Sequence, residues 1–291
     1  MKKVIIIGAG VGGLATALRL KAQGLDVLVI ENNSYPGGKL SSFNLGKYRF
    51  DAGPSLLTMP HYIDELFELF NENPQDYFNY KKKDISCKYF WDDSTVLNAY
   101  SDKKKFVNEI NKVLKVDKKV ISKYLQNAKK KYVLTKSIFL EKSLHKLGTF
   151  LSRDLIKAIF NVHIFQIHKT LNKVNQDELK EPHLVQLFNR FATYIGSSPY
   201  KTPGMMTLIQ HLEHDQGTFV SEKGMINIPN TLYDLAKRNG VEFQFNKLVD
   251  EIVVEKNKAI GVKVNNTITK SDIVISNMDI VPTYNKLLKK S

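Results

Sequence analysis

The chain has 291 residues, a length typical of about two domains. Hydrophobic residues make up 43% of it and aromatic residues 10%, which is enough for a large core and excludes general disorder. No apolar run approaches the roughly 20 residues of a membrane-spanning helix, and the run after Met1 ends at Gly8, short for a signal peptide. The single Cys87 excludes an internal disulfide and a cysteine-based metal cluster, which favours a reducing, cytoplasmic compartment.

The chain is strongly basic, with 43 Lys and Arg against 29 Asp and Glu and a net charge of +14. Only five of the basic residues are arginine, the side chain on which nucleic-acid readers usually depend, so we expect no nucleic-acid partner. Dispersed lysines are typical of a solvated surface. The alternative is attraction to an anionic membrane, which would place the protein peripherally at the inner face of the membrane.

The first 31 residues carry a strand–turn–helix–strand pattern. Residues 3–7 are a β-branched run without alternation, as in a parallel strand buried on both faces. A glycine-rich turn and a helical stretch follow, Gly24 ends the helix, and residues 26–30 form a second strand that ends at Glu31. This pattern predicts a Rossmann-like α/β domain.

The turn in this unit predicts a dinucleotide site. One glycine permits the tight turn, one lets the backbone approach a pyrophosphate, and one lets the helix pack closely on the sheet, while the helix N-terminus offers free N–H groups. A carboxylate 23 residues after the first glycine can accept hydrogen bonds from a ribose. The residues are Gly8, Gly10, Gly12, Gly13 and Glu31; they leave FAD and NAD both open.

The next two motifs favour FAD through a resemblance. Gly37, Gly38 and Lys39 follow the second strand, and Phe50, Asp51, Gly53 and Pro54 come after a polar turn. In this order the motifs resemble those of the FAD-dependent amine oxidase and phytoene desaturase superfamily. The resemblance implies that the backbone and cation of residues 37–39 serve the FAD phosphates and ribityl chain. It also implies that Asp51, Gly53 and Pro54 shape the floor beneath the isoalloxazine.

The middle of the chain has a different texture. Residues 60–215 have mostly helical spacing and Lys-rich faces, and Asp92, Asp93 and Ser94 predict a turn between two short strands. Residues 191–203 combine aromatic residues, small residues and two prolines, and resemble a segment of bacterial-type phytoene desaturases. Two interpretations stay open, a direct wall of the substrate site and a helix end and loop packed under the substrate domain.

The predicted architecture is a glutathione-reductase-type FAD-binding domain of α/β class with an inserted, mostly helical substrate domain. The expected parts are residues 1–59 and 216–280 for the FAD-binding domain, 60–215 for the insertion, and 281–291 for the start of a second substrate segment. The resemblance also implies that Val249, after a predicted strand at 241–245, contacts adenine through its backbone. Relatives continue to a C-terminal glycine-rich segment that nothing here matches, so we expect a shortened family member.

The resemblance implies an FAD-dependent enzyme that introduces C=C bonds into an apolar polyene such as phytoene. The alternatives are a hydroxycarotenoid desaturase, a carotenoid isomerase, an amine oxidase, or an inactive truncated fragment. No metal site is expected, because His163 and His168 share no helix face, and His211 and His214 have no third ligand. The sequence assigns no catalytic residue, oligomeric state or electron acceptor.

Overall fold

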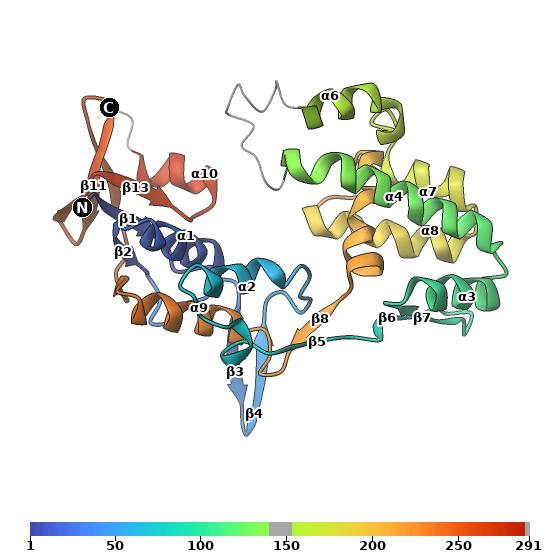
Figure 1. Ribbon diagram of the computed structural model, residues 1–291, viewed down its shortest axis with the longest axis horizontal. Helices are drawn as coiled ribbons and strands as arrows, with labels where there is room; N and C mark the ends of the chain where they lie inside the picture. The colour runs from blue at the N-terminus through green and yellow to red at the C-terminus, as the bar shows by residue number, and fades with distance from the viewer. Residues whose placement is uncertain (140–152, 289–291) are drawn as a thin grey trace. The chain divides into compact units, whose positions relative to one another are not determined.

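The computed structural model describes residues 1–139 and 153–288 and divides the chain into two compact units. Unit 1 contains Met1–Lys81 and Phe219–Ser291, and unit 2 contains Lys82–Thr218 (Figure 1). Unit 2 is therefore inserted between two segments of unit 1.

Unit 1 is built on a parallel sheet in the order β13-β1-β2-β9. Its strands are β1 (Lys3–Ile7), β2 (Asp26–Ile30), β9 (Glu242–Gln244) and β13 (Ile273–Ser276). Ile6 pairs with Val29 on one side and with Ile275 on the other, so β1 lies inside the sheet. Strands with neighbours on both sides and layers on both faces have no polar face, which explains their continuous apolar sequence.

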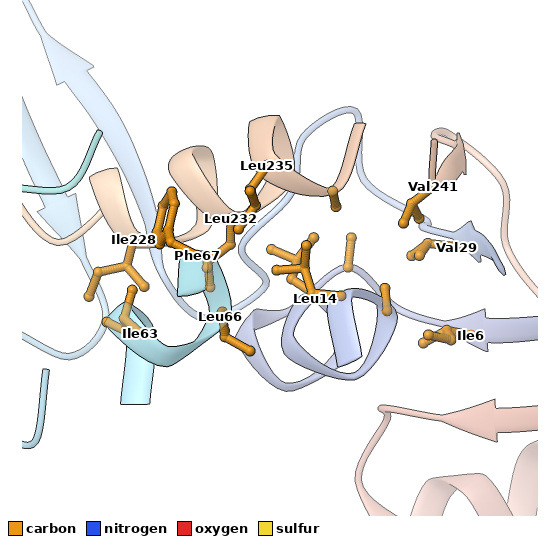
Figure 2. Packing of buried hydrophobic residues seen from close by; sticks show 14 of the residues in the cluster. Ile6, Leu14, Val29, Ile63, Leu66, Phe67, Ile228, Leu232, Leu235 and Val241 are labelled. Atoms are coloured by element: carbon orange, nitrogen blue, oxygen red, sulfur yellow. The ribbon is translucent and has the colours of Figure 1, made fainter. Parts of the chain in front are cut away.

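Alternate residues of β1 bury on opposite faces of this sheet. Val4 and Ile6 pack against three helices, which are α1 (Val11–Ala22), α2 (His61–Glu68) and α9 (Asn227–Arg238). Figure 2 shows this layer, where Leu14, Phe67 and Leu232 come together from the three helices. The layer forms because each helix has one apolar face with helical spacing.

On the other face, Ile5 and Ile7 pack with Ile252 and Val262 of a second sheet. This sheet is antiparallel, in the order β10 (Glu251–Glu255), β11 (Lys258–Val264) and β12 (Thr267–Lys270). Unit 1 also contains the hairpin β3 (Ser41–Leu45) and β4 (Tyr48–Ala52), the strand β8 (Phe219–Ser221) and the short helix α10 (Ile280–Pro282), and the strand β5 (Tyr80–Lys82) crosses from unit 1 to the first residue of unit 2. The three layers are helices, parallel sheet and antiparallel sheet, and they confirm the predicted Rossmann-like α/β fold.

Unit 2 is mostly helical. Its helices are α3 (Lys103–Leu114), α4 (Lys118–Phe139), α6 (Arg153–Phe160), α7 (Leu171–Leu179) and α8 (Pro182–Asn189), with 3₁₀ segments at Val162–Phe165, Arg190–Ile195 and Gly204–Ile209. The predicted turn at residues 92–94 joins β6 (Ile85–Phe90) to β7 (Val96–Tyr100). Phe106, Phe188 and Phe191 lie in its main core. Within the described ranges, no helix combines the length and apolarity needed to cross a bilayer.

The unit boundaries differ from those expected at residues 59/60 and 280/281. Helix α2 belongs to unit 1, because Ile63, Leu66 and Phe67 bury against the same core as Leu14 and Leu232. Leu287 likewise buries in the core of unit 1. An amphipathic pattern indicates that a helix buries one face, and it leaves open which neighbour covers that face.

Candidate functional site

The turn between β1 and α1 is tied to the end of β2. Gly8 has a φ of +97° and its N–H donates to the carbonyl of Ile30 at 2.8 Å. The Ala9 N–H donates to Glu31 Oε2 at 2.7 Å, and the Asn33 N–H donates to Glu31 Oε1 at 2.8 Å. Glu31 is 6% exposed, so this carboxylate is a buried acceptor that holds the glycine turn in place.

Gly13 lets α1 begin directly against that turn. A Cβ at Gly13 would lie 2.1 Å from the carbonyl oxygen of Gly8, a distance that no real side chain tolerates. Gly10 is the N-cap of α1 and provides no side-chain hydrogen bond to the first turn. The N-terminal N–H groups of α1 are therefore available to an anion, as the sequence predicts.

The second glycine motif packs on the first. The Gly37 N–H donates to the carbonyl of Ala9 at 2.9 Å, and Gly37 forms an isolated β-bridge with Gly10. A Cβ at Gly38 would lie 3.4 Å from the Cα of Gly10. Two motifs that are almost thirty residues apart in the sequence thus form one wall, and Gly38 and Lys39 lie at its exposed side.

The third motif has a structural role as well. A Cβ at Gly53 would lie 1.9 Å from the carbonyl oxygen of Lys39, so the two motifs are in close contact. Asp51 accepts hydrogen bonds from the Met225 N–H at 2.8 Å and from Arg49 at 2.6 Å. Burial works against ionisation of Asp51, but these donors outweigh it and hold the pKa of the carboxyl below its ordinary value. Asp51 therefore anchors the hairpin to the segment before α9.

These segments surround a cavity of 1280 Å³ in unit 1. Most of the residues that the sequence predicts for the site line it, namely Gly8, Gly10, Glu31, Gly37, Gly38, Lys39, Pro54 and Val249. Gly12, Gly13, Asp51 and Gly53 are not among the residues that line the cavity. Much of the remaining wall is apolar and includes Leu40, Leu57, Ile63 and Met225.

The structure also places residues at the cavity that sequence reasoning missed. Asn277 follows β13, and its side chain lies against Gly10, Gly12 and Gly13, with Nδ2 3.0 Å from a Cβ built at Gly10. Lys247 and Lys286 add two cations to the lining. The sequence shows Asn277 directly after a strand, but it does not show that this strand pairs with β1 and so ends beside the glycine turn.

The predicted segment at residues 191–203 lies in unit 2, and some of its side chains are buried while others are exposed. Phe191 and Ala192 are in the core, whereas Tyr194 and Tyr200 are exposed by 38% and 67%. Tyr194 donates a hydrogen bond to Glu213, which also accepts from Arg190 at 2.6 Å.

Among the described residues, no three His, Cys, Asp or Glu side chains converge to hold a metal ion.

The family model for flavin containing amine oxidoreductases matches residues 11–285. The chain belongs to this family. Among solved structures, an oxidoreductase from Methanosarcina mazei aligns with a TM-score of 0.62 and 17% identity, over 98% of this chain and 61% of that one. Putrescine oxidase bound to putrescine aligns with a TM-score of 0.63 and 14% identity, over 99% of this chain and 60% of its own. These identities support the fold alone.

Two curated relatives of this flavoprotein chain act on carotenoids according to their names. A 1-hydroxycarotenoid 3,4-desaturase from Flavobacterium sp. is 49% identical over 99% of this chain and 59% of the relative. A 4,4'-diapolycopene oxygenase from Methylomonas sp. is 31% identical over 99% of this chain and 58% of the relative. The chain therefore spans somewhat less than three fifths of the length of these relatives.

The residues at the cavity fit FAD, and the predicted cofactor is confirmed by the family. The uncapped N-terminus of α1 suits a diphosphate, and Glu31 is an acceptor suited to ribose hydroxyls. Gly8, Gly10, Gly37 and Gly38 line the cavity without side chains, so their backbone is open to a cofactor. A volume of 1280 Å³ exceeds that of a typical drug-sized pocket, about 300–1000 Å³, as a large dinucleotide requires.

Proposed function

We propose that the chain carries the FAD-binding part of a carotenoid desaturase, an enzyme that introduces C=C bonds into an apolar polyene. The observation that carries this proposal is the 49% identity to a 1-hydroxycarotenoid 3,4-desaturase over 99% of the chain. The chain covers 59% of that relative, so the activity of a full-length protein is part of the proposal.

In this proposal the residues of the cavity divide the cofactor between them. The N–H groups at Gly10, Gly12 and Gly13 bind the diphosphate, and Glu31 accepts hydrogen bonds from the ribose. The backbone of residues 37–39 and the Lys39 ammonium face the phosphates and ribityl chain, and Val249 contacts adenine through its backbone. Pro54 lines the isoalloxazine end, while Asp51 and Gly53 hold that wall in place through their contacts with Met225 and Lys39.

Bound FAD would supply the acceptor for a hydride from one carbon of the polyene. The chain contributes orientation and exclusion of water. Leu57, Ile63 and Met225 give the cavity an apolar wall beside the glycine surface. Apolar walls of this kind suit a substrate without charged groups, and they leave the flavin edge dry. We assign no side chain as the acceptor of the proton lost from the neighbouring carbon.

For the substrate we propose a hydroxylated carotenoid. The family resemblance of the sequence implies phytoene, and that stays a prediction. A hydroxycarotenoid desaturase was among its alternatives, and the relative at 49% identity favours that alternative. Unit 2 is the proposed substrate unit, and peripheral association with a membrane would give it access to the polyene.

Anaerobic flavin bleaching tests the proposal. The purified chain is loaded with FAD and mixed with a 1-hydroxycarotenoid, with phytoene or with putrescine. We expect the flavin absorbance to fall with the hydroxycarotenoid, more slowly with phytoene, and to stay constant with putrescine. Reduction by putrescine and not by either polyene would replace the proposal with amine oxidation.

A further inference from the structure

Helix α6 and the segment after it expose several large apolar side chains. Ile156, Ile159 and Phe160 are exposed by 47%, 61% and 80%, and Val162 and Ile167 follow with 50% and 57%. Isolated exposed apolar residues are common, but five within twelve residues form a patch that a solvated surface does not explain.

Three of the five residues lie on one face of α6, and the other face of this helix is already used. Ala158 buries with Ile138 of α4, and Leu155 packs against the same small cluster. Residues 156, 159 and 160 are spaced i, i+3 and i+4, so they share the opposite face. In Figure 1, α6 lies beside the C-terminal part of α4 at the edge of unit 2. The exposed face is therefore not needed for packing among the described residues.

The charge of the chain is concentrated in the unit that carries this patch. Between residues 82 and 218 there are 24 Lys and Arg against 13 Asp and Glu, a net charge of +11. Unit 1 has 19 against 16, a net charge of only +3. Within the patch, Lys157, His163 and His168 are exposed between the apolar residues. A second copy would meet this surface with the same strong positive charge.

We propose that the exposed face of α6 and residues 162–167 docks on an anionic lipid bilayer. The apolar side chains would enter the boundary between headgroups and acyl chains, and Lys157 and the surrounding lysines would face the anionic headgroups. The inference deepens the proposed function, since it names the surface through which a membrane-borne polyene would be approached. It rests on exposure and charge, and its test does not require turnover.

Vesicle flotation with the purified chain tests the inference. The vesicles contain phosphatidylcholine alone or phosphatidylcholine and phosphatidylglycerol in equal parts. We expect binding to the anionic vesicles, weakened by salt, and little binding to the neutral ones. Phe160→Ser removes one large apolar side chain from the bilayer and should weaken binding to the anionic vesicles by about tenfold. The double variant that also carries Ile159→Ser should weaken binding by about tenfold more.

Phe90→Ser is the matched control, because Phe90 is 71% exposed on β6 of the same unit. It should bind like the unaltered chain. Hydrogen exchange on the unaltered chain provides a second measurement, in which anionic vesicles should protect the amides of residues 155–168. Failure of the chain to bind anionic vesicles would overturn the inference. Equal binding by Phe160→Ser and Phe90→Ser, without protection of residues 155–168, would also overturn it.

The flavin spectrum of the same samples separates this inference from the proposed function. A chain that holds FAD and is bleached by polyenes but ignores vesicles would refute only the membrane surface. A chain that binds vesicles through α6 and is not bleached by any polyene would refute only the desaturase.

Discussion

Alanine at Gly13 should loosen the glycine turn, whereas alanine at Gly12 should not. A Cβ at Gly13 would lie 2.1 Å from the Gly8 carbonyl oxygen, about 1.2 Å short of the ~3.3 Å at which carbon and oxygen normally meet. Both atoms belong to the backbone of a packed layer, so α1 and the end of β1 would have to separate. Overpacking of this kind costs about 1–3 kcal/mol.

Gly12 provides the internal control. A Cβ there would lie 2.7 Å from Oδ1 of Asn277, the end of a side chain that can rotate away. Both substitutions gain about 0.5–1 kcal/mol from the better helix propensity of alanine. Because this gain is common to both variants it cancels in their comparison, and we expect Gly13→Ala to lower the free energy of unfolding by ~1–3 kcal/mol relative to Gly12→Ala.

Urea unfolding followed by far-ultraviolet circular dichroism measures this difference. Trp91 is the single tryptophan and lies in unit 2, so its fluorescence reports the unit that neither substitution touches. We expect Gly13→Ala to weaken FAD binding as well, because the displaced turn no longer presents its N–H groups together. Equal unfolding midpoints and equal FAD affinities for the two variants would refute the role given to Gly13.

Three further predictions concern buried polar groups. Burial lowers the pKa of Lys131 from its ordinary 10.5 to about 8. Between these two pH values the unfolded chain binds one more proton than the folded chain, so the free energy of unfolding should rise by up to about 3 kcal/mol as the pH increases through this window. The difference in pH slope between the unaltered chain and Lys131→Met measures this, and identical slopes would contradict it. Burial lowers the pKa of His214 to about 3, and the His214 and Phe106 rings stack with their centroids 4.2 Å apart. The free energy of unfolding should therefore fall as the pH decreases from 6.5 towards 3, and His214→Phe should unfold at a lower pH than the unaltered chain. Equal acid midpoints would contradict this. In Glu31→Gln an amide N–H would face the N–H of Ala9 or Asn33. The unpaired donors should lower the free energy of unfolding in urea by ~1–3 kcal/mol and weaken FAD binding. The same stability and FAD affinity as the unaltered chain would show that the carboxylate is dispensable.

The part of the site that sequence predicts well is local. Gly8, Gly13 and Glu31 belong to one strand–turn–helix–strand unit, and the geometry of that unit places them together whatever surrounds it. The resemblance to a family added residues 37–39, which the structure brings against Gly10. Both groups line or support the same cavity.

The part that sequence predicts poorly depends on distant partners. Asn277 reaches the glycine turn only because β13 pairs in parallel with β1, a register that no local pattern reveals. Helix α2 has a clear apolar face, but the pattern does not say that Leu14 and Leu232 cover it. The exposed face of α6 was missed for a similar reason, since helical spacing indicates which residues share a face and leaves open whether that face is buried.

The central claim is that unit 1 forms an FAD site at the glycine turns, and titration of the purified chain with FAD tests it most directly. We expect saturation at one FAD per chain, a flavin spectrum altered by the apolar wall, and weaker binding by Gly13→Ala than by Gly12→Ala. A chain that is folded by circular dichroism and binds no FAD, or that binds it equally well in both variants, would contradict the account.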